Sequence, residues 1–499
     1  MPNLAANRAE LAAVEGPQEP LAWRPSAEKA ARYRDERVAY WNHYVRRAPS
    51  NYYHRRLAEI YRLIVPRGRR VLELGCGDGD LLAALEPSRG VGVDFADRRV
   101  ERARAKHPGI EFVLQDVHEL DLPGTFDYII FSDLLNDLWD VERAFHRIAP
   151  LCEPGTRIVI NSYNRLWETP LAAVRRMGLV NPFIAQNWFT AEDIENMLYL
   201  SGFETIRKWR EILLPMRIPG ADALFNRYLT RVAPIDGLSL ANFLVARPAW
   251  QNRAASEPEP IVSVIVPARN EAGNIEGVFR RVPEMGAGTE LVFVEDHSTD
   301  DTFEVIERTA ARFPSRRCKI MRSPGRTKGK GDTVRAGLAA AAGEVLIILD
   351  ADLTVAPEDL PRFYDALRSG KGEFINGVRL VYPMEQEAMR FINLAGNKFY
   401  SAAFSWLIGQ PIKDTLCGTK VISRANYELI AKNRAYFGDF DPFGDFDLIF
   451  GAAKLNLKIV DLPVRYAERT YGRTNISRWR HGWMLLKMIG FASRRMKFV

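Results

Sequence analysis

The chain has 499 residues, which is too long for one ordinary hydrophobic core and favours two or three domains. Apolar residues make up 47% and charged residues 26%, so the composition excludes fibrous and wholly disordered proteins. The formal net charge of +7 is compatible with nucleic acid, a membrane surface or a phosphorylated substrate as partner, and composition alone does not choose among them.

The cysteines and the N-terminal segment indicate a cytoplasmic protein. Cys76, Cys152, Cys318 and Cys417 lie far apart with no CxxC pair, which argues against a zinc site or a disulfide framework. Residues 1–20 lack the apolar core of a signal peptide, and we expect a weakly ordered lead-in there. No run of 18 uninterrupted apolar residues occurs, so we predict no membrane-crossing helix.

Two segments, beginning at residues 69 and 260, share one pattern: a β-branched run, a polar or glycine-rich turn, a helical stretch and another run. This alternation predicts the α/β class, with parallel sheets and crossover helices in two different domains. The predicted organisation is an N-terminal extension (1–49), a first α/β domain (50–247), a linker rich in Pro, Glu and Ala (248–260), a second α/β domain (261–475) and a basic amphipathic helix (476–499).

The stretch VLELGCGDGDLL predicts a strand, a glycine-rich turn and a helix that together bring backbone close to a ligand. Gly75, Gly77 and Gly79 are spaced two apart, unlike the GxGxxG of a dinucleotide site, and Glu73 before them suits a ligand with a positive amino group. Asp94 ends the next predicted strand about 20 residues later, where a carboxylate accepts hydrogen bonds from ribose hydroxyls.

Asp116 follows the third predicted strand and Asp133 follows the fourth. This ordered set resembles the class I S-adenosylmethionine-dependent methyltransferases over residues 50–247. The resemblance implies a Rossmann-like fold and S-adenosylmethionine as cofactor, bound by Glu73, Gly75, Gly77, Gly79, Asp94 and Asp116. A degenerate or NAD-binding Rossmann domain is the alternative.

Methyl transfer needs positioning above all, and a base only where the acceptor must lose a proton. The candidate bases are His118, Asp133, His146 and Tyr163, each of which is also compatible with an ordinary surface or packing role. The sequence does not identify the methyl acceptor.

In the stretch LIILDADLT, four branched apolar residues precede Asp350 and Asp352. A continuous apolar run is typical of a central strand, and open α/β sheets bind ligands at the carboxyl ends of such strands. Two aspartates spaced two apart can bind Mg²⁺ or Mn²⁺ and leave room for substrate phosphates. Alternatively, Asp350 is a turn residue and Asp352 caps a helix that begins near Pro357.

The order VSVIVPARNEAGNI, FVEDHSTDDT, TKGKGDTVRAG and LIILDADLT resembles family 2 glycosyltransferases with the GT-A fold. The resemblance implies a nucleotide-diphosphate sugar as donor and Asp350 and Asp352 as ligands of the metal. The residues implied for the nucleotide are Pro267, Asn270, Glu271, Glu295, Asp296, Lys330 and Gly331. Glu295-Asp296-His297-Ser298 departs from the common Asp-Asp-Gly-Ser, which puts the preferred base or sugar in doubt.

The stretches 413–424 and 443–477 resemble the subgroup that transfers sugars to polyprenyl (dolichyl) phosphate. Lys413 stands where the subgroup commonly has Gln. The motif Arg-x-x-Gly-x-Ser-Lys is matched only in part by Arg469, Gly472, Thr474 and Asn475, so one expected cation is missing, and Arg473 is the candidate to replace it.

The two acceptor classes require different residues. A phosphate is already a charged nucleophile at neutral pH, whereas a hydroxyl requires a base. For a hydroxyl acceptor we expect Asp445 or Asp447 to be that base. For a phosphate acceptor we expect basic side chains to hold it: Arg379, Lys420, Arg469 and Arg473. Either reaction is expected to be a single displacement with inversion.

The segment 476–499 mixes aromatic and apolar residues with many cations. These residues are Trp479, Trp483, Leu486 and Phe491 with Arg478, Arg480, Lys487, Arg494, Arg495 and Lys497. Such a helix can lie on an anionic membrane surface, which predicts a protein peripheral on the inner face of the membrane. The alternative is a helix packed on its own domain with a solvated basic face.

The leading hypothesis is a bifunctional enzyme: a metal-dependent inverting glycosyltransferase acting on a polyprenyl-phosphate-like acceptor, fused to a methyltransferase acting on an intermediate of the same pathway. A glycosyltransferase with a hydroxyl acceptor is one alternative, and a fusion in which one domain only binds or scaffolds is another. Nucleic-acid binding is not expected, because the positive charge is spread along the chain and no RNA- or DNA-binding motif occurs.

Overall fold

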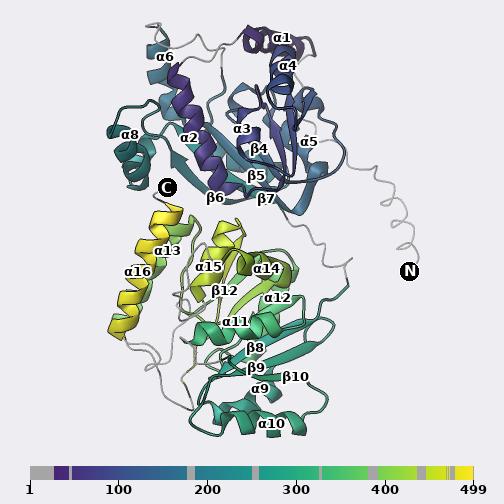
Figure 1. The fold of residues 1–499 in the computed structure, drawn as a ribbon, viewed down its shortest axis with the longest axis vertical. Helices are drawn as coiled ribbons and strands as arrows, with labels where there is room; N and C mark the ends of the chain where they lie inside the picture. Colours follow the sequence, from purple (N-terminus) through teal and green to yellow (C-terminus); the bar gives the residue numbers. More distant parts are fainter. Residues whose placement is uncertain are drawn as a thin grey trace, which may run out of the picture.

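The computed structural model describes residues 27–43, 48–176, 186–249, 258–324, 329–379, 391–434, 445–467, 469, 471 and 478–497. These residues form two α/β halves, each built on a seven-stranded mixed sheet (Figure 1). The two-domain α/β prediction is therefore confirmed. None of the helices in these ranges is long and apolar enough to span a membrane.

The first sheet has the strand order β3-β2-β1-β4-β5-β7-β6, with β7 antiparallel to both of its neighbours. Its strands are β1 (Arg70–Leu74), β2 (Arg89–Asp94), β3 (Glu111–Leu114), β4 (Phe126–Ser132), β5 (Cys152–Tyr163), β6 (Phe203–Glu211) and β7 (Ala241–Pro248). The helices of this half are α1 (Ala27–His43), α2 (Ala48–Ile64), α3 (Asp80–Ala84), α4 (Asp97–Lys106), α5 (Val141–Ile148), α6 (Glu168–Arg176), α7 (Ala191–Leu200) and α8 (Ala221–Ala223). Hydrophobic clusters cover both faces of the sheet, which explains the continuous apolar runs in its central strands.

The second sheet has the order β10-β9-β8-β11-β13-β12-β14, with β13 antiparallel to both of its neighbours. Its strands are β8 (Val262–Ala268), β9 (Thr289–Glu295), β10 (Arg317–Arg322), β11 (Val345–Ile348), β12 (Phe374–Val378), β13 (Lys420–Ser423) and β14 (Ile459–Pro463). The helices are α9 (Ile275–Arg281), α10 (Thr302–Arg312), α11 (Lys330–Ala340), α12 (Leu360–Arg368), α13 (Phe391–Ile408), α14 (Arg424–Lys432), α15 (Asp445–Lys454) and α16 (Arg478–Met496).

Each sheet contains a point where the strand order reverses. In the first sheet β1 lies between β2 and β4, and in the second β8 lies between β9 and β11. At such a switch point the loops after the two central strands leave in opposite directions and open a crevice for a ligand. The glycine loop after β1 and the aspartates after β11 both lie at these points.

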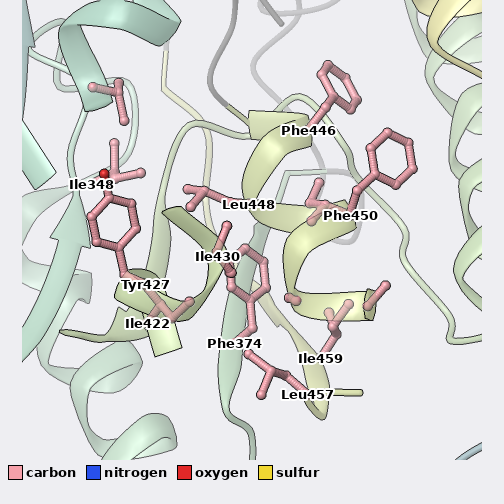
Figure 2. Close-up of a cluster of buried hydrophobic side chains, with 14 of the residues drawn as sticks. Ile348, Phe374, Ile422, Tyr427, Ile430, Phe446, Leu448, Phe450, Leu457 and Ile459 are labelled. Atoms are coloured by element: carbon pink, nitrogen blue, oxygen red, sulfur yellow. The ribbon is translucent and has the colours of Figure 1, made fainter. Parts of the chain in front are cut away.

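Aromatic packing holds α15 in place over the second sheet. Figure 2 shows Phe446 and Phe450 of this helix in the same hydrophobic cluster as Ile348 of β11 and Phe374 of β12. The ring centroid of Phe404 on α13 lies 5.0 Å from that of Phe446 and 5.2 Å from that of Phe450. The first turn of α15, which carries Asp445, is therefore positioned by the core.

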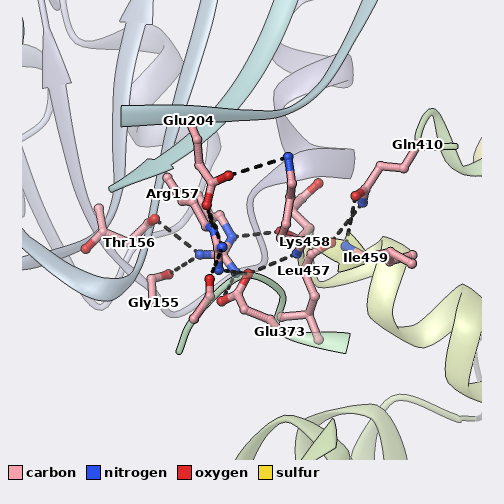
Figure 3. Close-up of polar contacts among 12 residues, drawn as sticks. Gly155, Thr156, Arg157, Glu204, Glu373, Gln410, Leu457, Lys458 and Ile459 are labelled. Atoms are coloured by element: carbon pink, nitrogen blue, oxygen red, sulfur yellow. Dashed lines mark hydrogen bonds and ion pairs between the residues drawn. The ribbon is translucent and has the colours of Figure 1, made fainter. Parts of the chain in front are cut away.

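A buried ion network joins the two halves (Figure 3). Arg157 of β5 donates from Nη2 to both carboxylate oxygens of Glu373 at 2.8 and 2.9 Å, and from Nε to the carbonyl of Asn456 at 2.8 Å. Arg247 of β7 lies 3.3 Å from Glu373, and its side chain is 1% exposed. Lys458 donates to the carbonyl of Thr205 at 2.8 Å.

Both halves meet at the amino ends of their parallel strands. Glu373 and Lys458 immediately precede β12 and β14, while Arg157 lies in the amino-terminal half of β5 and Arg247 near the end of the antiparallel β7. Asn456 donates to the carbonyl of Ile64 at 3.2 Å, at the end of α2. The carboxyl end of each sheet therefore lies on the side away from this interface.

The expected linker falls between β7 and β8. β7 ends at Pro248 and β8 begins at Val262, and residues 250–257 of the expected linker lie outside the described residues. The described part of the expected N-terminal extension includes α1, which packs on α4: Asn42 donates to Asp97 at 2.5 Å.

Candidate active sites

The loop between β1 and α3 has the backbone conformation that glycine favours. Gly75, Gly77 and Gly79 have φ values of 69°, 54° and 75°. Asp94, at the end of β2, accepts the N–H of Gly77 at 2.8 Å and that of Ala96 at 2.9 Å. Each of its oxygens keeps a further lone pair, so Asp94 both holds the loop and remains able to accept a ribose hydroxyl.

Glu73 is buried at the end of β1 beneath this loop. Its Oε2 atom is inaccessible and has no hydrogen-bond partner among the described residues. Burial raises the pKa of Glu73 to about 8. A positively charged ligand group at this position would supply the missing partner, so the residues present fit the amino group of S-adenosylmethionine.

Asp116 and His118 hold one another. Asp116 accepts the backbone N–H of His118 at 2.9 Å, and Nδ1 of the His118 ring lies 2.7 Å from Oδ1 of Asp116. Although burial acts to raise the pKa of Asp116, these bonds outweigh it and lower the pKa. The backbone N–H of Asp140 donates to Nε2 of His118 at 3.1 Å, so both ring nitrogens have protein partners. The structure thus gives His118 a positioning role in this loop, and it places His146 on the exposed face of α5.

Asp133 is the candidate base that lies at the switch point. It follows β4, and its Oδ1 atom accepts hydrogen bonds from the Tyr53 hydroxyl at 2.9 Å and the Asn161 amide at 2.5 Å. Tyr163, at the end of β5, lies beside this group, with its ring centroid 6.2 Å from that of Tyr53. Burial raises the pKa of Asp133 to about 7.

Helix α1 contributes residues that the motif analysis missed. The Arg99 guanidinium, which a side chain at Gly77 would meet, lies 5.1 Å from the ring centroid of Trp41 and 3.4 Å from Asp78. Tyr33 donates to the carbonyl of Asp137 at 3.2 Å. The available signal was the group of aromatic residues between positions 33 and 41, which is unusual for a weakly ordered extension.

In the second half, each aspartate of the DAD segment carries one cationic side chain. Lys330 Nζ lies 2.5 Å from Asp350, and Arg469 Nη2 lies 2.5 Å from Asp352. The other oxygen of Asp352 accepts the N–H of Thr354 at 3.1 Å. The residue at the N-cap of the helix at Pro357 is Ala356, so Asp352 does not cap that helix.

Lys330 and Asp350 stabilise each other's charge. Burial alone would lower the pKa of Lys330, but Asp350 and Asp445 outweigh it and raise the pKa. Burial likewise acts to raise the pKa of Asp350, and Lys330 reverses the effect. The site is therefore a charge-balanced cluster of acids and bases around the end of β11.

The loops after β8 and β9 are joined by hydrogen bonds. Asn270, with a left-handed φ of 57°, donates its N–H to Ser298 at 3.0 Å and accepts from the N–H of Thr299 at 2.7 Å. Glu295 accepts the N–H of Ser298. The neighbouring predicted residues all lie on these elements: Pro267 on β8, Asp296 after β9 at 3.6 Å from Arg269, and Gly331 in α11.

Arg469 connects the loop after β8 to the DAD segment. Its Nη1 atom lies 3.2 Å from Glu271, while its Nη2 atom contacts Asp352. Burial raises the pKa of Glu271, and the charge of Arg469 opposes that effect. The structure thus brings Glu271, Asp352 and Arg469 together from three separate parts of the sequence.

Asp445 and Asp447 have different partners. Asp445 lies 3.3 Å from Lys420, and burial raises its pKa although Lys420 and Lys330 act against this. Asp447 lies 2.8 Å from Arg335 and 3.5 Å from Arg434. It also lines a separate small pocket between α14 and α15. Asp445 therefore belongs to the charged cluster, and Asp447 belongs to an ion pair on another face of the helix.

The basic residues expected to hold a phosphate also have different partners in the structure. The Arg379 guanidinium makes two hydrogen bonds to Asp414, at 2.7 and 2.9 Å, and the pKa of Asp414 falls to about 2 because this charge outweighs burial. Lys420 is buried beside Asp445 and Cys417. Gly472, Arg473, Thr474 and Asn475 lie outside the described residues.

Helix α16 packs on its own half while keeping apolar side chains exposed. Leu485, Met488 and Ala492 are buried in the core cluster that includes α13 and α15. Trp483 is 62% exposed and Leu486 is 41% exposed. Helix α16 thus packs on its own domain and also keeps two apolar side chains exposed to solvent.

The donor set at the end of β11 suits a hard divalent cation in part. Within the described ranges, no group of three or more His, Cys, Asp or Glu side chains converges on one point. Asp350 and Asp352 supply carboxylate oxygens, which Mg²⁺ and Mn²⁺ prefer. The residues fit a cation whose remaining ligands come from water and substrate phosphates.

Comparison with known proteins assigns both halves. A model of glycosyl transferase family 2 matches residues 263–427, and a methyltransferase-domain model matches residues 41–208. A dolichol-phosphate mannosyltransferase of Pyrococcus furiosus is 30% identical over 251 residues, which are 48% of this chain and 67% of the relative. A probable S-adenosylmethionine-dependent methyltransferase of Mycolicibacterium smegmatis is 29% identical over 163 residues. That alignment covers 32% of this chain and 61% of the relative's length.

A glucosyl-3-phosphoglycerate synthase of Mycobacterium tuberculosis, solved with Mn²⁺ and uridine diphosphate, is similar at 20% identity. The similarity covers 50% of this chain and 85% of that structure, with a TM-score of 0.36. The family assignments rest on the sequence matches to the two halves. The chain belongs to glycosyl transferase family 2 through its second half, and its first half is a methyltransferase domain.

Proposed function

We propose that the second half transfers a sugar, with inversion, from a nucleotide-diphosphate sugar to a polyprenyl-phosphate-like acceptor. The observation that carries this proposal is the charged cluster at the switch point, where Asp350 and Asp352 lie with Lys330, Arg469 and Asp445. The name of the archaeal relative, a dolichol-phosphate mannosyltransferase, supports a lipid phosphate as acceptor.

The residues have distinct proposed roles in this reaction. Asp350 and Asp352 would hold Mg²⁺ or Mn²⁺, which when bound neutralises the diphosphate of the donor. Asn270, Glu271, Glu295 and Asp296 lie on the two loops beside the metal position and would orient the nucleoside. Lys330, whose pKa is raised, stays protonated and can pair with a diphosphate oxygen.

The cations around the cluster suit a phosphate nucleophile. Lys330 pairs with Asp350 and Arg469 pairs with Asp352, the two proposed metal ligands. A metal ion bound with the donor would compete for these carboxylates. Donor binding would therefore release the two cations toward phosphate oxygens. A lipid phosphate is already charged near neutral pH and needs no base. Trp483 and Leu486, exposed on α16, would contact the membrane that carries such a lipid.

A hydroxyl acceptor is the second candidate, because one observation favours it. Asp445 lies in the cluster with a raised pKa, as is suitable for a general base, whereas Asp447 is held by two arginines. In that reaction Asp445 would accept the proton of the hydroxyl as the sugar is transferred.

We further propose that the first half binds S-adenosylmethionine and methylates an intermediate of the same pathway. The unpartnered buried oxygen of Glu73 and the glycine loop held by Asp94 support this cofactor. Asp116, on the loop after β3, would contact the adenine. When bound, the cofactor supplies an activated methyl group.

The first test is sugar transfer by the purified chain, followed by mass spectrometry with Mn²⁺ or Mg²⁺, a panel of nucleotide-sugars and a short polyprenyl phosphate. We expect a lipid-linked sugar that disappears in Asp352→Ala, because this change removes one of the two proposed metal ligands. Asp447→Asn is the matched control for Asp445→Asn. With a phosphate acceptor, Asp445→Asn should retain transfer within about tenfold, since no proton need be removed.

The outcomes separate the two acceptors. Donor hydrolysis without lipid transfer would exclude the polyprenyl-phosphate acceptor. A loss of about 100-fold or more in Asp445→Asn but not in Asp447→Asn would instead assign Asp445 as the base for a hydroxyl.

A further inference from the structure

The end of β4 carries a carboxylate that the cofactor site does not use. Asp133 adopts a left-handed backbone conformation with φ of 54°, which is uncommon for a residue with a side chain and is typical of functional sites. Its backbone N–H donates to the carbonyl of Asn161 at 3.2 Å. The strained position is thus held by β5, the neighbouring strand.

Asp133 adjoins the cofactor loop. The next residue, Leu134, packs directly against Gly75: a Cβ atom added to Gly75 would lie 2.8 Å from Leu134 Cδ1. Asp133 therefore directly precedes the residue that packs on the loop proposed to bind S-adenosylmethionine. Its carboxylate lies at the same carboxyl edge of the sheet as Glu73 and Asp94.

A chain of hydrogen bonds orients one oxygen of this carboxylate. Tyr61 donates to Oδ1 of Asn161 at 2.7 Å, and the Asn161 amide donates to Oδ1 of Asp133 at 2.5 Å. The Tyr53 hydroxyl donates to the same Asp133 oxygen at 2.9 Å. Both donors thus converge on Oδ1 and leave Oδ2 outside this chain of hydrogen bonds. The Tyr53 ring also belongs to an aromatic group at this edge: its centroid lies 6.2 Å from that of Tyr163, and the Tyr163 centroid lies 6.4 Å from that of Trp188.

The charges around Asp133 favour a base that works near neutral pH. Burial raises its pKa to about 7, the bonds from Tyr53 and Asn161 act against that effect, and the charge of Asp137 adds to it. Among the described residues, no cation contributes to the pKa of Asp133. Burial raises the pKa values of Tyr53 and Tyr61, so their hydroxyls stay protonated and continue to donate. A general base is most effective when its pKa lies near the operating pH.

We infer that Asp133 is the general base of the methyltransferase half and that the methyl acceptor is a hydroxyl group. Oδ2 takes the hydroxyl proton while the oxygen forms its bond to the methyl carbon. The sulfur–methyl bond breaks, and S-adenosylhomocysteine leaves as a neutral thioether. The positive charge of the sulfonium departs as the proton on Asp133, so atoms and charge balance. This inference rests on the proposed S-adenosylmethionine-dependent activity.

The test uses the full chain, radiolabelled S-adenosylmethionine and p-nitrophenyl hexosides as hydroxyl acceptors, with p-aminophenyl hexosides beside them. We expect log(kcat/KM) to rise with unit slope up to about pH 7 and then to level, because the base must be deprotonated. Asp133→Asn should lose about 100-fold or more and should lose this pH limb.

Tyr53→Phe provides a test that does not require the carboxylate to be removed. This change deletes a hydrogen bond that lowers the pKa of Asp133, so the limb should move to higher pH. Tyr364→Phe, at a tyrosine of the other half bonded to Glu259, should leave the profile unchanged. The same shift should be seen without an acceptor, by carbon NMR titration of aspartate-labelled protein with Asp133→Asn as the difference reference.

Calorimetry of S-adenosylmethionine binding separates the two proposals. If wild type does not bind the cofactor, the proposed methyltransferase function fails. If wild type and both variants bind it within about threefold of one another, but the Asp133 resonance titrates below pH 5 or Tyr53→Phe leaves it unmoved, the inference alone fails. Methylation of the amines and none of the hydroxyls would also overturn it.

Discussion

The carboxyl group of Glu73 offers a residue-scale prediction about cofactor binding. The pKa of Glu73 is raised from 4.5 to about 8 in the folded protein, so below pH 8 the group holds a proton that the unfolded chain releases near pH 4.5. A bound cation favours the ionised form and must expel that proton. Affinity for S-adenosylmethionine should therefore rise between pH 5.5 and 7.5, by up to about tenfold per pH unit.

Calorimetry across this pH range checks that expectation. In Glu73→Gln the affinity should be weaker and independent of pH, because no proton is exchanged. A wild-type affinity that stays constant over the same range would show that Glu73 does not face the cofactor.

At the scale of elements, the β1–α3 loop depends on its left-handed glycines. An alanine at Gly77 would be strained at φ of 54°, and its Cβ would lie 2.4 Å from the Arg99 guanidinium. We expect Gly77→Ala to cost about 1–2 kcal/mol of stability and to weaken S-adenosylmethionine binding about tenfold, because the N–H that Asp94 accepts must move.

Gly109→Ala is the matched control for that loop. Gly109 has open space around its missing side chain and no left-handed φ. Denaturation and calorimetry should place Gly109→Ala with wild type. Equal effects of the two alanines would mean that the loop is not held in the conformation described.

At the scale of the whole molecule, the two halves are joined by a buried ion network and should unfold together. Arg157→Met removes one cation from Glu373 and leaves Arg247 at 3.3 Å as its remaining ion-pair partner. Breaking a buried pair costs about 3–5 kcal/mol, and we expect the lower end because Arg247 remains. Urea denaturation, followed by probes in both halves, should show a less stable chain whose transitions separate.

Arg280→Ala is the surface control for this experiment. The Arg280–Glu276 pair is exposed, at 59% and 39%, so its loss should change stability by less than about 1 kcal/mol. Coincident transitions at wild-type stability in Arg157→Met would show that the network does not couple the halves.

The same interface places the two candidate active edges away from each other, so an intermediate shared by both reactions would have to leave one half to reach the other.

Much of the fold and both families could be predicted because the signals are local. The apolar run LIIL, the glycine spacing after β1 and the alternation of strands and helices each reflect short-range rules of burial and backbone conformation. The positions of Glu73, Asp94, Asp350 and Asp352 at strand ends follow from the same rules. Parallel strands place their carboxyl ends at one edge, so local motifs also predict which loops meet.

The ion-pair and hydrogen-bond partners of the site residues could be identified only from the tertiary structure, because these partners lie far apart in the chain. Only packing distinguishes Asp445, beside Lys420, from Asp447, beside Arg335. In the same way, only packing shows that Asp133 accepts hydrogen bonds from Tyr53 and Asn161.

By itself, the sequence determined two α/β domains, their families and the strand ends that carry the acidic residues, since hydrophobic period and turn chemistry are written into neighbouring residues. The tertiary structure alone decided that α1 packs on the methyltransferase half, that Arg469 bridges Glu271 and Asp352, and that the halves meet through Arg157 and Glu373. These contacts join positions up to 216 residues apart, and charge pairing over such separations is set by how sheets and helices pack.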